Sequence, residues 1–219
     1  MKPFKPPPAP VTRAIIIACI GVQVAATLLG THFANMLAET AGLIPARLVD
    51  GIAPGVAGGG VPAPLTLVTA LFLHAGWLHL GLNLVFLGWV GKYVEWVFGP
   101  WRFAGLYLLG GVAGNLLQVA VDPHSTGVVI GASGAIAAIF GAYAVMFAGS
   151  RASGRRVLGV AVSSEAATAL WFAAVWIGLQ LATGYLFRVD GQGIAIWAHI
   201  GGFITGLIFA QPYLKGPRV

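Results

Sequence analysis

Four polar residues that could do chemistry together lie in strongly apolar stretches of the sequence. Ser133 opens GASGAIAAIFGAY, His199 lies in IWAHIGGFITG, and His79 and Asn83 lie in HAGWLHLGLNLVFLGWV. A serine hydroxyl is a poor nucleophile unless a base takes its proton, and His199 is the natural base for Ser133. His79 and Asn83 are four residues apart, so they share one helix face and could both donate to a developing oxyanion.

Glycines surround the candidate nucleophile and the candidate base. We expect Gly131 and Gly134 to leave room for an oxyanion and a substrate beside Ser133. Gly134 would also let the backbone approach another helix. Gly202 and Gly206 form a GxxxG pattern, which lets two membrane helices pack closely enough for a direct Ser–His hydrogen bond.

Three of the four polar residues also have a plainer interpretation. Ser133 alone would be a small packing residue, His199 a histidine satisfied between helices, and Asn83 an amide that holds helices together. A metal site is disfavoured, because there is no HExxH and no carboxylate accompanies the histidines in the apolar runs. We therefore expect neither a metal nor a cofactor.

The composition indicates a polytopic membrane protein that is all α-helical. Of the 219 residues, 58% are hydrophobic and 8% charged, and the mean hydropathy is +0.88. A soluble domain has about 25% charged residues and could not cover so much apolar surface. Cys19 is the single cysteine, which excludes an internal disulfide. The net charge of +6 lies in short loops, so topology explains it better than a nucleic-acid partner does.

The elements that must position these residues are six membrane spans within a domain at 13–213. We expect a disordered proline-rich tail at 1–12 and a short tail at 214–219, both cytoplasmic. A long first external loop, partly embedded, would cover 31–64 and extend to about residue 75, with a short turn at 150–156. The predicted spans are residues 12–30, 76–95, 101–120, 131–149, 167–187 and 194–213.

The charge distribution predicts how these spans run. With the N-terminus in the cytoplasm, the inner loops and tails hold ten basic residues and the outer ones two, Arg47 and Arg188. The second, fourth and sixth spans then all begin at the outer face. The four polar residues come out at one depth, roughly 3 to 15 Å below the outer surface. A transporter reading would instead need polar residues and broken helices near the midplane.

At these residues the sequence resembles the rhomboid family of intramembrane serine proteases, of the six-span bacterial type. The resemblance covers about residues 13–213. HAGWLHLGLN matches the second-span motif of the family, GASGA the GxSG of its nucleophile, and AHIGGFITG the motif of its base. YVEWVFG resembles the ExxxG that ends the second span, and His74 matches a loop histidine with a structural role.

The resemblance implies a serine endopeptidase in which Ser133 and His199 form the dyad, and in which the Ser133 backbone, His79 and Asn83 form the oxyanion hole. Its partners would be single-pass membrane protein substrates and the lipid bilayer. It would be a multi-pass protein of the bacterial inner membrane whose active site opens to the outside. The alternative is a non-proteolytic rhomboid-like protein that binds membrane clients.

Two positions depart from the family pattern. Leu65 and Thr66 stand where many members carry a Trp-Arg pair, and Ala137 stands where an aromatic residue often stacks on the base. Phe140, one turn further, is a candidate substitute for that aromatic residue.

Overall fold

The computed structural model describes residues 8–52, 60–148, 155–157, 160–162, 171, 174–175, 178 and 195–214. The regular elements in this part of the chain are helices, apart from a short antiparallel pair, β1 (Arg155–Val157) and β2 (Val160–Val162). The segment 150–156, predicted as a turn, therefore contributes to a strand, in line with the β-branched valines of both partners. The helical elements in chain order are α1 (Pro10–Leu28), α2 (Gly30–Ala41), α3 (Pro45–Val49), η1 (Ala63–Leu65), α4 (Thr66–Thr69), η2 (Ala70–Phe72), α5 (Trp77–Phe86), η3 (Leu87–Gly91), α6 (Lys92–Phe98), α7 (Pro100–Val121), α8 (Ser133–Ala148) and α10 (Ile196–Leu214).

Two of the described helices, α1 and α7, are long and apolar enough to cross a membrane. The helices at Ala63–Phe72 and Trp77–Phe98 pass the same test together but are bent by 80° at the break between them, so they count as a third candidate at most. α8 is apolar but shorter. The predicted span at 167–187 falls almost wholly outside the described residues, so the six-span count stays a prediction.

The first connection, predicted as a long loop over 31–64, contains the helices α2 and α3. The side chain of Arg47 holds it together. Its guanidinium donates to the carbonyl oxygens of Glu39 (3.0 Å), Thr40 (3.3 Å) and Val61 (3.0 Å). Helical backbone satisfies its own polar groups, which favours helix over irregular loop beside an apolar environment.

The start of α1 is capped by a residue far along the chain. The carboxylate of Glu95 in α6 accepts hydrogen bonds from the backbone N–H groups of Val11 and Thr12, each at 2.8 Å, and from the Thr12 hydroxyl at 2.7 Å. The first N–H groups of a helix have no partner within it and carry partial positive charge. Glu95, only 2% exposed, supplies the missing acceptor and joins α6 to α1.

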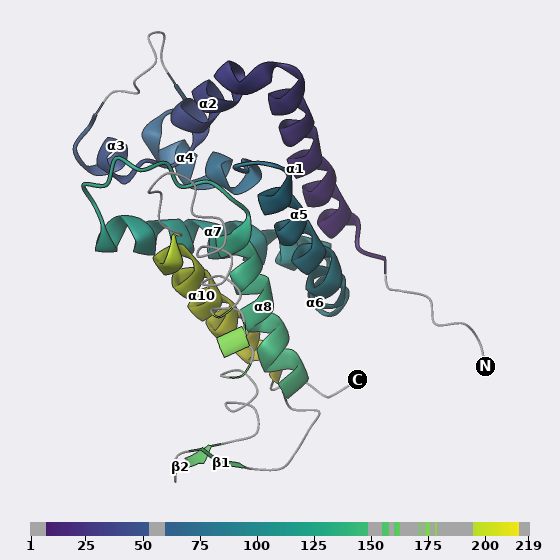
Figure 1. Ribbon diagram of the computed structural model, residues 1–219. Coiled ribbons are helices and arrows are strands. Elements are labelled where there is room, and N and C mark those ends of the chain that lie inside the picture. The colour runs from purple at the N-terminus through teal and green to yellow at the C-terminus, as the bar shows by residue number, and fades with distance from the viewer. Residues whose placement is uncertain are drawn as a thin grey trace.

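Helices α7, α8 and α10 form the centre of the fold, and α8 and α10 run side by side (Figure 1). Glycines allow this packing. A Cβ added at Gly114 of α7 would collide with the carbonyl of Ala198 in α10, and one added at Gly110 would collide with Ala138 of α8. The three backbones therefore approach more closely than larger residues would permit.

The helix that carries His79 begins at Trp77, after Gly76 with φ 139°. This agrees with the predicted outer end of the second span near Gly76. The helix continues through a single π turn, η3, into α6. Figure 1 shows α5 and α6 on the opposite side of α8 from α10.

Candidate active site

The structure brings Ser133 and His199 into contact. Ser133 is the first residue of α8, His199 lies in the first turn of α10, and Ser133 Oγ is 2.6 Å from His199 Nε2. The imidazole is only 5% exposed. A short hydroxyl–imidazole contact of this kind is the arrangement in which a histidine takes the proton of an attacking serine.

Close approach of the two helix backbones makes this contact possible. A Cβ added at Gly202 would collide with the carbonyl of Gly134, and one added at Gly134 would lie 3.2 Å from the carbonyl oxygen of Ala198. A Cβ at Gly206 would collide with the carbonyl of Ala138. Gly134 and Gly202 thus lie in the interface between α8 and α10, at the level of the Ser–His pair.

His79 comes from α5 and faces the same space. A Cβ added at Gly131 would lie 3.0 Å from both Cε1 and Nε2 of His79, and 3.6 Å from Ser133 Oγ. The backbone N–H of Ala75 donates to Nδ1 of His79 at 3.3 Å. Because Nδ1 then acts as an acceptor, the neutral ring carries its hydrogen on Nε2, the nitrogen next to Gly131.

Asn83 lies one turn below His79 and is buried, with 5% exposure. Its amide nitrogen donates to the backbone carbonyl of His79 at 2.9 Å. An amide NH₂ has two hydrogens, so this bond orients the side chain and leaves a second hydrogen for another acceptor.

The loop before Ser133 is fixed at several points. Gly131 has φ +135°, a conformation that side chains disfavour, and its N–H donates to the carbonyl of Ala70 at 2.9 Å. Leu43 and Val129 exchange two backbone hydrogen bonds, at 3.1 and 2.7 Å. The nucleophile helix therefore starts from a loop tied to both the first connection and η2.

At the two positions that depart from the family pattern, the structure shows the local surroundings of the residues present. Thr66 donates its hydroxyl to the carbonyl of Ala63, while the guanidinium that anchors the first connection comes from Arg47. Ala137 is fully buried, and Phe140 stacks on Tyr143 with ring centroids 6.4 Å apart. The only sequence signal for the role of Arg47 was that it is the single basic residue of the predicted outer loop at 31–64.

Two further contacts surround the candidate site. His74 packs edge-to-face against His79, with ring centroids 5.1 Å apart. Within the described ranges no three His, Cys, Asp or Glu side chains gather in a way that could hold a metal ion. What the arrangement offers is an acceptor for the serine proton and hydrogen-bond donors beside the serine oxygen.

Comparison with known proteins places the chain in a family. A family model described as Rhomboid domain matches residues 63–216. RHOMBOID-like protein 5 of Arabidopsis thaliana is 31% identical over 152 residues, which is 69% of this chain and 45% of that protein. Rhomboid-like protease 5 of Toxoplasma gondii is 32% identical over 142 residues (65% of this chain, 15% of that protein). Rhomboid protease GluP of Bacillus subtilis is 31% identical over 153 residues (69% and 26%). The chain spans less than half the length of each of these three relatives.

Proposed function

The chain belongs to the rhomboid family, and on that premise we propose that it is an intramembrane serine endopeptidase that cleaves single-pass membrane proteins in or near their transmembrane segment. The observation that carries the proposal is the 2.6 Å contact between Ser133 Oγ and His199 Nε2. The chain is an integral membrane protein with apolar helices, in which polar side chains are costly and usually functional. Some relatives are named proteases, which supports the same activity.

Ser133 is the proposed nucleophile and His199 the proposed general base. As Oγ attacks the carbonyl carbon of the scissile bond, its proton passes to Nε2 of His199. The C–N bond then breaks, and His199 returns the proton to the leaving amine. A water molecule, deprotonated by His199, then attacks the acyl ester on Ser133. The ester C–O bond breaks, His199 returns the proton to Ser133 Oγ, and the new carboxylic acid is released.

Three donors support stabilisation of the oxyanion in this proposal. The Nε2–H of His79 lies next to Gly131, two residues before Ser133, and Asn83 has an amide hydrogen not used by the His79 carbonyl. The backbone N–H of Ser133 lies in the first turn of α8, where a helix provides no acceptor for it. Preorganised donors aimed at the developing charge are usually the largest single contribution to such catalysis.

We further propose six spans, both termini in the cytoplasm, and an active site that opens to the outside of a cell membrane. The bias of basic residues toward the predicted inner segments supports this topology. The proposed partners are transmembrane substrates and the bilayer. Reporter fusions after Val121 and after Phe98 would test it, because the first should report the outside and the second the cytoplasm.

The proposal is tested by incubating the purified chain, in detergent and in liposomes, with a single-pass model substrate. Ser133→Ala and His199→Ala should each abolish cleavage, whereas Thr31→Ala, which removes an exposed hydroxyl on α2, should not change it. A fluorophosphonate probe should label Ser133 alone. Cleavage that survives Ser133→Ala would refute the mechanism, and capture of the substrate without cleavage would favour the client-binding alternative.

A further inference from the structure

The π turn η3 interrupts the helix that carries His79 and Asn83. It covers Leu87–Gly91, five residues between α5 and α6. A π turn closes its hydrogen bond from residue i to i+5 instead of i+4, so it holds one residue more than an α turn. Glycines stand at 88 and 91, and a Cβ at Gly91 would lie 3.2 Å from Thr12 Oγ1 and 3.3 Å from the Phe103 ring.

The extra residue changes which side chains lie above one another. In an uninterrupted α-helix, residues 18 apart share a side, because 18 residues make five turns of 3.6. His79 and Val97 are 18 apart, so a straight helix would place them on one side. Yet Val97 is 44% exposed, while His79 faces Gly131.

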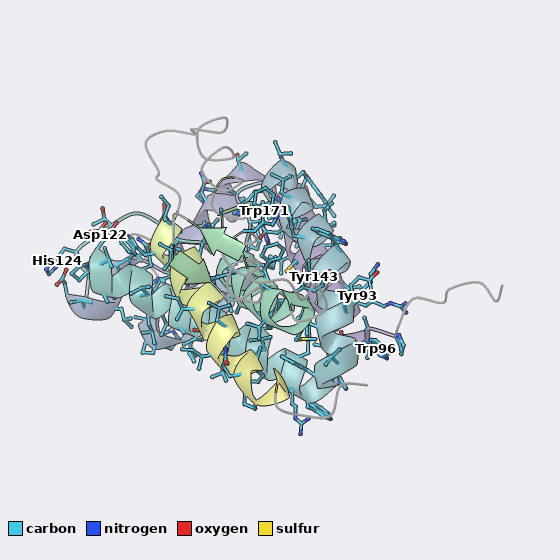
Figure 2. The ribbon with its side chains drawn as sticks, turned by 90° about the horizontal axis from the view of Figure 1, so that it is seen from below. Tyr93, Trp96, Asp122, His124, Tyr143 and Trp171 are labelled. Carbon is cyan, nitrogen blue, oxygen red and sulfur yellow. The ribbon has the colours of Figure 1, made fainter. Side chains whose placement is uncertain are left out.

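Because the π turn holds one extra residue, side chains 19 residues apart, and not 18 apart, share a side of the helix. Trp77 and Trp96 are such a pair, exposed by 51% and 65%, and so are Leu78 and Val97, exposed by 53% and 44%. Figure 2 shows Trp96 at the periphery of the ribbon. These apolar side chains form one continuous lipid face along α5 and α6. Leu78 and Trp96, which are 18 apart and both exposed, fit either register. The buried Glu95, 18 residues from the exposed Trp77, fits only the shifted one.

The same one-residue shift brings Asn83 of α5 and Glu95 of α6 onto nearly the same side of the helix. Asn83 and Glu95 are twelve residues apart, which in a straight helix would turn them about 120° from each other. With one extra residue the difference falls to about 20°. Glu95 cannot rotate freely, because it holds three hydrogen bonds from Val11 and Thr12.

We propose that η3 sets the register of the active site: its extra residue lets His79 and Asn83 face Ser133 while Glu95 stays bonded to α1. If the same residues formed one straight α-helix and α6 kept its position, α5 would be rotated by about 100°. His79 would then lie above Val97 on the lipid face. The role given to His79 and Asn83 rests on the proposed function. The relative orientation of α5 and α6 does not depend on the proposed function.

The proposal makes an unusual prediction about deletions. Removing Gly88 leaves α5 and α6 in the same relative orientation, because the shortened turn closes as an ordinary α turn. This deletion variant should keep kcat within about threefold of the parent and unfold at a similar temperature. Inserting one alanine after Gly88 should instead rotate α5 by about 100° and lower kcat at least a hundredfold, the loss typical of missing oxyanion donors.

Deletion of Leu109 is the matched control, since it removes one exposed residue from the regular helix α7. It should abolish both cleavage and cooperative unfolding. The proposal is overturned if the Gly88 deletion is as inactive as His79→Ala, or fails to fold, or if the insertion keeps the parent's activity. Should the parent itself not cleave, the proposed function fails, and the unfolding temperatures of the three variants alone decide the register.

Discussion

The backbone N–H of Ala75 donates to Nδ1 of His79, and this bond decides which nitrogen of the ring can serve the active site. Since Nδ1 accepts, Nε2 carries the hydrogen and points toward the space beside Ser133 Oγ. A donor rather than an acceptor is what a developing oxyanion requires. A backbone group has no side chain to mutate, so the bond is insensitive to substitution at Ala75 itself.

We therefore expect His79→Ala and Asn83→Ala each to lower kcat by about 10²- to 10³-fold with little change in KM, because they remove donors used mainly in the transition state. Steady-state cleavage of a model substrate in detergent gives both constants. His32→Ala, on the exposed side of α2, is the control and should leave both unchanged. A rise in KM with unaltered kcat would show that these residues bind substrate instead.

The packing of α8 against α10 predicts that Gly202→Ala abolishes cleavage and lowers the unfolding temperature. The added methyl group collides with the carbonyl of Gly134, so the helices must separate and the Ser–His contact is lost. Gly105→Ala is the control, because a Cβ there meets nothing within 4 Å. It should be neutral or slightly stabilising, since alanine favours a helix interior over glycine. Equal effects of the two substitutions would contradict this account.

The cap on α1 predicts a loss of stability without a direct effect on the dyad. Glu95→Ala leaves two backbone donors and one hydroxyl without their acceptor, and should lower the free energy of unfolding by about 2 to 4 kcal/mol. Thr12→Val removes one of the three bonds and should cost about 1 kcal/mol. In a double-mutant cycle, adding Thr12→Val to Glu95→Ala should cost almost nothing more. Additive losses would show that the two residues act independently.

The contacts of Arg47 predict that lysine cannot replace arginine at this position without loss of stability. Its guanidinium reaches three carbonyl oxygens at once, from Glu39, Thr40 and Val61, and the point charge of a lysine cannot reproduce that fork. Arg47→Lys and Arg47→Ala should therefore lower the unfolding temperature by similar amounts. Arg13→Ala, at an exposed position of α1, should not. Full stability of Arg47→Lys would mean that charge alone anchors the first connection.

The contact between His124 and Asp50, outside the apolar helices, predicts that stability depends on pH. It lies with Asp122 at the edge of the molecule (Figure 2), and its Nδ1 is 3.0 Å from a carboxylate oxygen of Asp50. The hydrogen bond that His124 donates to the Asp50 carboxylate, and the charge of that carboxylate, raise the pKa of His124 above the ordinary 6.5, and Asp122 adds a smaller effect. A raised folded-state pKa means that the contact stabilises fully below pH 6.5 and is lost as pH rises through the folded value.

An NMR titration of His124 measures this directly. Asp50→Asn should return the pKa of His124 close to its ordinary value, and Asp122→Asn should lower it by less. The ion pair is exposed, so added salt should weaken the effect. An unchanged His124 titration in Asp50→Asn would exclude the contact.

Much of the candidate site follows from the sequence because polar groups are costly in apolar helices. Ser133, His199, His79 and Asn83 stood out for that reason, and a common depth was enough to predict that they meet. The predicted role of Gly202 and Gly206 in close packing also follows from their four-residue spacing, since small residues at that spacing line one helix face. The structure places both glycines against α8.

Other features depend on contacts that no local pattern records. The loop expected at 31–64 contains α2 and α3. No strong apolar pattern announces α2, because GTHFANMLAETA is only moderately apolar and begins with Gly30, two residues after the end of α1. No local sequence pattern predicts the π turn, because it arises only when Glu95 is bonded to α1 while His79 and Asn83 face α8. Glu95 caps a helix start that lies far from it along the chain. Arg47 bonds only to backbone carbonyl groups, which no side-chain pattern records.

The close contact between the backbones of α8 and α10 has a consequence for how bilayer thickness acts on the protein. Membrane helices adapt to a thicker or thinner bilayer by tilting. Because glycine and carbonyl groups interlock along α8 and α10, these two helices must tilt as a pair, and the Ser133–His199 distance travels with them unchanged. α5 is separated from η2 by the 80° break, and a Cβ added at its Gly81 meets nothing within 4 Å, so α5 lacks this glycine interlock. Lipid chain length should therefore alter the oxyanion donors while it leaves the nucleophile and its base intact.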